Sequence, residues 1–115
     1  MDKANIGTIK IADAVVSTIA GIAALEVEGV SKLSGGITKE SVAKTSKRGL
    51  SKGVSAVIEE GKVTVSISYE LLFGYSVKKV SEDIQNKIKQ AIETMTGLEV
   101  VKVNVVVSGI SADRN

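Results

Sequence analysis

The sequence contains no cysteine and no histidine, and these two absences exclude several kinds of site. Without cysteine the chain holds no disulfide, no thiol nucleophile and no iron–sulfur or zinc–thiolate centre. Without histidine it lacks the commonest general base and the commonest metal ligand of proteins. The only aromatic residues are Tyr69, Phe73 and Tyr75, whereas single-stranded nucleic acids are usually bound by stacking on aromatic rings. These absences favour a protein without a catalytic centre and disfavour nucleic acid as a partner.

The remaining composition is that of one ordinary globular domain. The 115 residues are 43% hydrophobic and 24% charged, which suffices for one domain, residues 1–115, with its own core. The apolar residues are mainly valine, isoleucine, alanine and leucine. The longest mostly apolar segment, residues 14–25, is shorter than the roughly 20 residues of a membrane span, and residues 1–10 lack the apolar stretch of an export signal. We therefore expect a cytoplasmic protein whose contact with a membrane is peripheral at most.

Hydrophobic periodicity predicts five regular segments. Short alternation predicts a strand over residues 6–11, and an apolar stripe predicts an amphipathic helix over residues 14–26. Residues 54–73 alternate on both sides of a Glu-Gly turn and predict a hairpin. A second amphipathic helix is predicted over residues 77–96, and a strand over residues 98–108 follows the glycine that ends this helix. The predicted order is β-α-β-β-α-β.

This order predicts an α+β fold, a two-layer sandwich in which both helices cover one face of a mixed sheet. A strand–helix–strand unit of this length favours parallel pairing of its two strands. The odd-numbered valines at 101–107 are expected to face the helices. The opposite face is then expected to be open, with Val57, Leu72, Val100 and Val106 scattered among polar side chains. These four residues are candidates for a partner or self-association surface, and exposed strand edges are a further candidate.

Residues 31–53 differ from the rest because they are strongly basic. Six basic residues against one acidic residue give this segment a net charge of +5, which leaves −3 for the rest of a chain of net charge +2. Glycines interrupt the segment, so we expect a mobile loop with one helical turn near residues 40–47. Its candidate contact residues for an acidic partner, namely anionic lipid, protein or nucleic acid, are Lys44, Lys47, Arg48 and Lys52.

Known chemical motifs are missing. The glycines form neither a dinucleotide-binding fingerprint nor a P-loop, and no two of them are spaced for the G-x-x-G clamp of KH-type RNA domains. The paired carboxylates at 59–60 and 82–83 fall on a hairpin turn and on a helix surface. We therefore predict no catalytic residue, no metal ligand and no cofactor.

Three long segments of the chain are similar to a known family. They are GTIKIADAVVSTIAGIAALEVEGV (7–30), SKGVSAVIEEGKVTVSISYELLFGYSV (51–77) and SEDIQNKIKQAIETMTGLEVVKVNVVVSGI (81–110). Their most telling pieces are the run IA-x-x-A-x-x-EV-x-GV at the end of the first segment and MTGLEV-x-x-VNV within the third. In this order and spacing, the chain resembles the alkaline shock protein family of Gram-positive bacteria, also called the Gls-type envelope stress response family.

The resemblance implies a small cytoplasmic protein linked to cell-envelope homeostasis and to alkaline or envelope stress. Members of the family look like non-enzymes, and some lie beneath the cytoplasmic membrane, held there by a membrane-anchored partner, and self-associate. No catalytic residue is implied. The hypothesis is therefore a protein-interaction or self-associating scaffold module near the membrane. The alternative is a nucleic-acid-binding or regulatory module that uses the basic segment.

Overall fold

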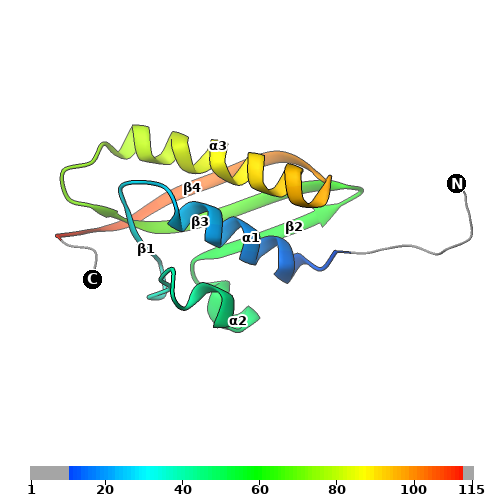
Figure 1. Ribbon diagram of the computed structural model, residues 1–115, viewed down its shortest axis with the longest axis horizontal. Helices are drawn as coiled ribbons and strands as arrows, with labels where there is room; N and C mark the ends of the chain where they lie inside the picture. Colours follow the sequence, from blue (N-terminus) through cyan, green and yellow to red (C-terminus); the bar gives the residue numbers. More distant parts are fainter. Residues whose placement is uncertain (1–10, 113–115) are drawn as a thin grey trace, which may run out of the picture.

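A computed structural model describes residues 11–112 of the chain (Figure 1). The predicted strand over residues 6–11 lies outside the described residues except for Ile11, which has no regular structure. The elements in chain order are α1 (Asp13–Leu25), β1 (Val30–Leu33), the 3₁₀ turn η1 (Val42–Lys44), α2 (Lys47–Leu50), β2 (Val54–Glu59), β3 (Lys62–Leu72), α3 (Val77–Thr96) and β4 (Glu99–Ser111).

The sheet is built around β3, which pairs with each of the other strands. The β2–β3 hairpin is antiparallel, and β1 pairs antiparallel with β3 beyond the end of β2, so that β1 and β2 lie in line along one side of β3. On the other side β4 runs parallel to β3, from the pair Lys62–Glu99 to the pair Leu72–Ser111. The predicted α+β class, the hairpin and the parallel pairing are confirmed, and the sheet is mixed.

The junction between β1 and β2 is tight. The Ser34 N–H donates to the carbonyl of Ser68 at 2.9 Å, and the Ser68 N–H donates to the carbonyl of Gly53 at 2.8 Å. A Cβ atom on Gly53 would lie 2.6 Å from the carbonyl oxygen of Ser34 and 2.9 Å from the Cβ of Leu33. Only glycine lets the two chain segments approach this closely.

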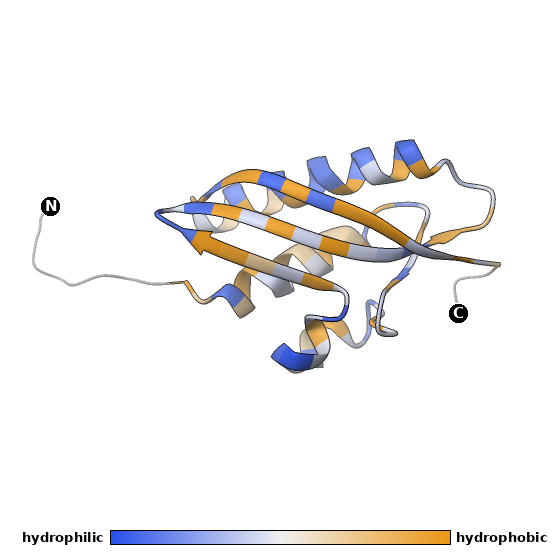
Figure 2. Cartoon of the chain, turned by 180° about the vertical axis from the view of Figure 1, so that it is seen from behind, coloured by the Kyte–Doolittle hydropathy of each residue, from blue (hydrophilic) through white to orange (hydrophobic). Residues whose placement is uncertain are grey.

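Helices α1 and α3 lie over one face of the sheet, as Figures 1 and 2 show from opposite sides. Helix α3 buries one residue per turn, which is the spacing of a single helical stripe: Val80, Ile84, Ile88 and Ile92. Tyr69 of β3 is completely buried beneath the helices, and its hydroxyl lies 3.0 Å from that of Ser81. Gly97 ends α3 in the left-handed conformation with φ of +75°, as the sequence predicts.

The predicted element order is incomplete, because residues 31–53 contain more structure than a loop with one turn. The turn expected near residues 40–47 is present as η1, but β1 and α2 were missed. Four apolar side chains of the segment are buried in the core: Leu33, Ile37, Val42 and Leu50. They stand singly among charged and hydroxyl residues, so they have no periodicity by which a strand or helix is recognised in a sequence.

The predicted facing of β4 is right for most of the strand and wrong at its beginning. Val103, Val105 and Val107 pack against the core as expected. Val101, however, is 51% exposed, and Val100 is only 6% exposed. The pairing jumps from Val63–Val100 to Thr64–Lys102, which makes Val101 the extra residue of a β-bulge and reverses the facing of the residues before it.

Candidate interaction surfaces

The face of the sheet turned away from α1 and α3 carries no helix (Figure 2). We call it the open face. Its central side chains are small and mostly uncharged: Ser55, Val57, Thr64, Ser66, Ser68, Lys102, Asn104 and Val106. Such a surface offers hydroxyl and amide groups with isolated apolar side chains between them.

The four apolar residues predicted for this face do not form one patch. Val57 of β2 and Val106 of β4 are on it and are 53% and 57% exposed. Their partners on β3 are Thr64 and Ser68, respectively, so polar residues of the central strand separate them. Leu72 is half-buried at the far end of β3. Val100 does not belong to the open face, because the bulge turns its side chain into the core.

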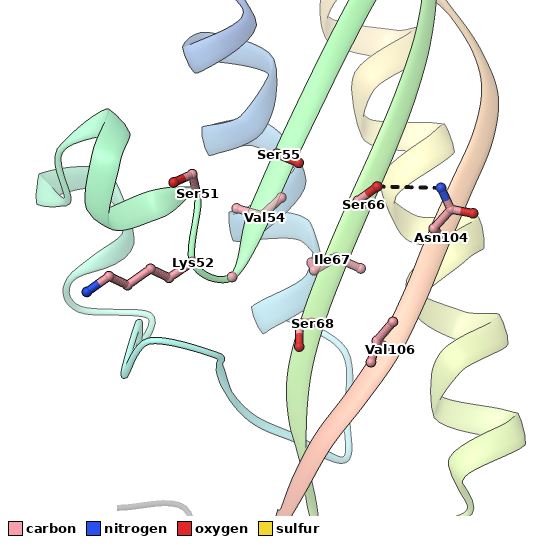
Figure 3. A pocket seen from close by; sticks show the side chains of 10 residues that line it. Ser51, Lys52, Val54, Ser55, Ser66, Ile67, Ser68, Asn104 and Val106 are labelled. Atoms are coloured by element: carbon pink, nitrogen blue, oxygen red, sulfur yellow. Dashed lines mark hydrogen bonds between the residues drawn. The ribbon is translucent and has the colours of Figure 1, made fainter.

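A shallow hollow of about 240 Å³ lies on the open face where β2, β3 and β4 meet the end of α2 (Figure 3). Ser55, Ser66 and Asn104 line it, and the Asn104 amide donates to the Ser66 hydroxyl at 3.4 Å. Lys52 belongs to the rim, and its side chain points away from the strands. The hollow is therefore lined by hydroxyl, amide and apolar groups, with Lys52 as its one charged side chain.

A chain of hydroxyl groups joins three strands at one end of this face. Ser34, just after β1, donates to the Ser108 hydroxyl at 2.6 Å, and Ser108 donates to the carbonyl of Tyr69 at 3.2 Å. The Ser34 and Ser68 hydroxyls are 2.7 Å apart. Since Ser34 already donates to Ser108, Ser68 is the donor in this pair. The chain of bonds holds β1 and β4 to β3.

The outer edge of β4, the side away from β3, is bonded by α3 along its first part. The Val100 N–H donates to the Glu93 carboxylate at 2.9 Å, and Lys89 donates to the Val100 carbonyl at 3.4 Å. Gln85 donates to the Val103 carbonyl at 3.1 Å. The hydrogen bond from Lys89, together with the one from Val100, lowers the pKa of Glu93 below its usual range. These contacts close the beginning of the edge against another strand.

The four candidate basic residues, Lys44, Lys47, Arg48 and Lys52, form the basic cluster. They lie on η1 and α2 and just after α2, and all four are exposed. None of them forms an ion pair with another residue in the range 11–112. The structure thus places these residues on one short stretch of the chain and leaves their charges to solvent.

Among residues 11–112, no group of three acidic side chains is arranged to hold a metal ion. No helix in this range combines the length and the apolar character needed to cross a membrane.

Comparison with known proteins settles the family. The model of the alkaline shock protein 23 family, described as having a "cell envelope-related function", matches residues 1–112. The chain belongs to the alkaline shock protein family. The resemblance drawn from the sequence motifs is therefore confirmed over nearly the whole length. The match also includes the basic segment, which contains none of the quoted motifs.

Relatives of this alkaline shock protein family member occur in Gram-positive bacteria. The chain is 33% identical to the uncharacterized protein YqhY of Bacillus subtilis over 109 residues, which cover 95% of this chain and 81% of the relative. It is 38% identical to the uncharacterized protein Spy1535 of Streptococcus pyogenes over 110 residues, covering 95% and 83%. No solved structure matches the chain significantly.

Sequence reasoning missed the hydroxyl chain and the bonding of α3 side chains to β4. Both depend on which residues the strand register brings together, and the register depends on two bulges. One signal in the sequence pointed toward the edge of β4, since residues 103–110 contain no charged side chain.

Proposed function

We propose that this member of the alkaline shock protein family is a non-enzymatic interaction module in cell-envelope homeostasis. It acts in the cytoplasm at the inner face of the cell membrane, where it binds a membrane-anchored protein partner and further copies of itself. The observation that carries the proposal is the open face, a full side of the sheet without a covering helix, on which Val57 and Val106 are exposed. The core of a protein interface is depleted in charged residues, and Lys102 is the one charged side chain among the central residues named for the open face.

The electrostatics of the sheet edge are consistent with a structural rather than a catalytic role. Glu93, with its lowered pKa, is held by Lys89 and by a backbone N–H. A carboxylate general base that works near neutral pH needs a raised pKa instead. The two hydrogen bonds that lower the pKa of Glu93 also attach α3 to β4, so a structural role is enough to explain the shifted pKa.

The test of the open face compares substitutions at positions of similar exposure, because Val57 is 53% and Val15 is 51% exposed. The double variant Val57→Lys with Ser66→Lys places two charges on the open face, and Val15→Lys places one on a similarly exposed position of α1. Each tagged variant is used for affinity capture from lysate with the membrane fraction retained. The open-face variant is expected to lose a membrane-fraction protein that the wild type and Val15→Lys retain.

A capture pattern that is the same for all three proteins would contradict the use of the open face. The urea midpoints of the variants serve as the control for folding. Because all three substituted positions are exposed or nearly so, the free energy of unfolding is expected to change by less than about 0.5 kcal/mol.

The basic cluster supports the peripheral location. Its charges are exposed and unpaired within the described residues, and a basic residue near an anionic membrane contributes about 1 kcal/mol. Flotation with anionic and neutral vesicles is expected to show binding to the anionic ones only, and the variant Lys47→Glu with Arg48→Glu is expected to abolish it. Equal flotation with both vesicle types would overturn this location.

Fluorescence anisotropy with RNA and DNA at low salt tests the alternative function, a nucleic-acid-binding module that uses the basic cluster. This alternative requires binding that weakens steeply as salt rises.

A further inference from the structure

Strand β4 is the longest strand of the sheet and pairs with β3 along one side only. On its other side, α3 side chains bond both backbone groups of Val100 and the carbonyl of Val103. Because backbone groups alternate in direction along a strand, Val105 and Val107 direct their N–H and C=O groups to the same outer side as Val103. No described side chain bonds to these groups. The second half of the edge is thus open to a further strand.

The opposite edge of the sheet differs from this one. It is divided between β2, which has six residues, and β1, which has four. The outer side of β1 is partly closed, because the Leu33 N–H donates to the carbonyl of Ile37 at 2.8 Å. The long unpaired run of the described sheet therefore lies on β4.

The side chains of this run lack the usual protection of an exposed edge. Natural edge strands commonly carry charged residues or proline that prevent pairing with another chain. Residues 103–110, VNVVVSGI, contain neither. Val106 and Ile110 are 57% and 62% exposed, and Figure 2 shows long hydrophobic stretches on this strand. An uncharged, valine-rich edge of this kind fits another strand of the same composition.

We propose that the outer edge of β4 pairs antiparallel with the same edge of a second copy, about a two-fold axis at Val105. The pairing rests on the self-association in the proposed function and assigns its interface. It places Val103 opposite Val107 and Asn104 opposite Val106. Lys102 then lies opposite the uncharged Ser108, so no like charges meet. A two-fold interface needs a surface that complements itself, and VNVVV reads almost identically in both directions.

The two bulges of β4 set the limits of the paired run. The register with β3 shifts at Val101 and again at Ser108, and the strand is regular between them. Gln85 already donates to the Val103 carbonyl. Within this run each copy therefore contributes the N–H of Val103, both backbone groups of Val105 and the C=O of Val107, which make about four backbone hydrogen bonds between the copies. The sheets of the two copies become continuous, while the open face of each copy remains free for the partner.

The absence of native cysteine allows a direct test with single-cysteine variants. In Val105→Cys the two thiols lie at the axis, where the Cα atoms of a hydrogen-bonded antiparallel pair are about 5.5 Å apart, within the range for a disulfide. In Val101→Cys the thiol is on an exposed residue of the same strand. In the proposed dimer, however, the two introduced cysteines are separated by eight residue steps along the strands, or about 26 Å. On mild oxidation we expect Val105→Cys to form a covalent dimer at least ten times faster than Val101→Cys.

A second variant tests the backbone bonds. Val105→Pro removes an N–H that points away from β3, and proline is tolerated on the outer side of edge strands. In sedimentation the wild type is expected to associate with rising concentration, whereas Val105→Pro is expected to remain a monomer that unfolds cooperatively in urea. Open-face stacking is tested with Val57→Cys, which cross-links rapidly only if the sheets pack face to face.

Three outcomes would overturn the pairing: equal cross-linking at Val105 and Val101, preferential cross-linking at Val57, or a wild type that stays monomeric at high concentration. If the wild type is monomeric and Val105→Pro loses a captured membrane-fraction protein, the edge binds a strand of another protein instead. The proposed use of the open face is tested separately. If the double variant Val57→Lys with Ser66→Lys captures the same proteins as the wild type, that use is contradicted, even when Val105→Cys forms the expected covalent dimer.

Discussion

Substitution of Gly53 by alanine tests whether the tight junction between β1 and β2 matters for stability. The added Cβ would lie 2.6 Å from the carbonyl oxygen of Ser34, and atoms in proteins do not approach a Cβ closer than 3.0 Å. The backbone must therefore move by about 0.4 Å at a point where two hydrogen bonds join the segments to Ser68. Overpacking of this kind costs about 1–3 kcal/mol, and each weakened hydrogen bond costs up to about 1 kcal/mol more. The expected loss is about 2–4 kcal/mol.

Urea unfolding measures this loss, with Gly109→Ala as the matched control. Gly109 is in β4, its φ is not in the left-handed region, and the nearest atom to an added Cβ is 3.9 Å away, in Glu70. Gly109→Ala is expected to be neutral or to stabilise the protein by about 0.4–1 kcal/mol. Gly53→Ala is expected to lower the urea midpoint by about 1–2 M. Equal midpoints for the two variants would refute the close approach of β1 and β2.

Three other substitutions test the core and the attachment of α3. Ile88→Ala removes a completely buried side chain from α3 and is expected to lower the free energy of unfolding by about 2–5 kcal/mol in urea. Tyr69→Phe leaves the Ser81 hydroxyl without its 3.0 Å partner and is expected to cost about 1 kcal/mol in the same assay. Glu93→Gln tests how stability depends on pH. The pKa of Glu93 is lowered in the folded state, chiefly by the hydrogen bond from Lys89. The ionised carboxylate therefore stabilises the fold above its unfolded pKa of about 4.3, and this stabilisation is lost as the pH falls through the lowered pKa. The difference in stability between wild type and Glu93→Gln is therefore expected to shrink below about pH 4, and a constant difference would contradict the assignment.

The helices and the hairpin were predictable because each has its own repeating signal. Helix α3 shows an apolar residue at nearly every turn and ends at Gly97, and its observed bounds are the predicted ones. The hairpin alternates on both sides of its turn, and its strands are observed within residues 54–73. Such signals depend only on neighbouring residues, so one sequence is enough to detect them.

The missed features depend on residues far apart in the sequence. Strand β1 is four residues long and is held mainly by its pairing with β3, from Val30–Leu71 to Leu33–Tyr69. The bulge at Val101 exists because of the pairing with β3, and nothing in the valine run itself distinguishes Val100 from Val101. Two of the predicted surface residues, Val57 and Val106, are therefore exposed on the open face, whereas Val100 is in the core.

The central position of β3 also dictates the order in which the sheet can assemble. Each of the other described strands, β1, β2 and β4, pairs with β3 and with no other strand of the sheet. The β2–β3 hairpin closes over a two-residue turn, but Lys62 must find Glu99, 37 positions later, before β4 can dock. Local contacts form fastest because they lose the least chain entropy. The hairpin is therefore expected to form first, and β1 and β4 then pair with it independently of each other. Amide protons of β3 are expected to be the last to exchange with deuterated solvent.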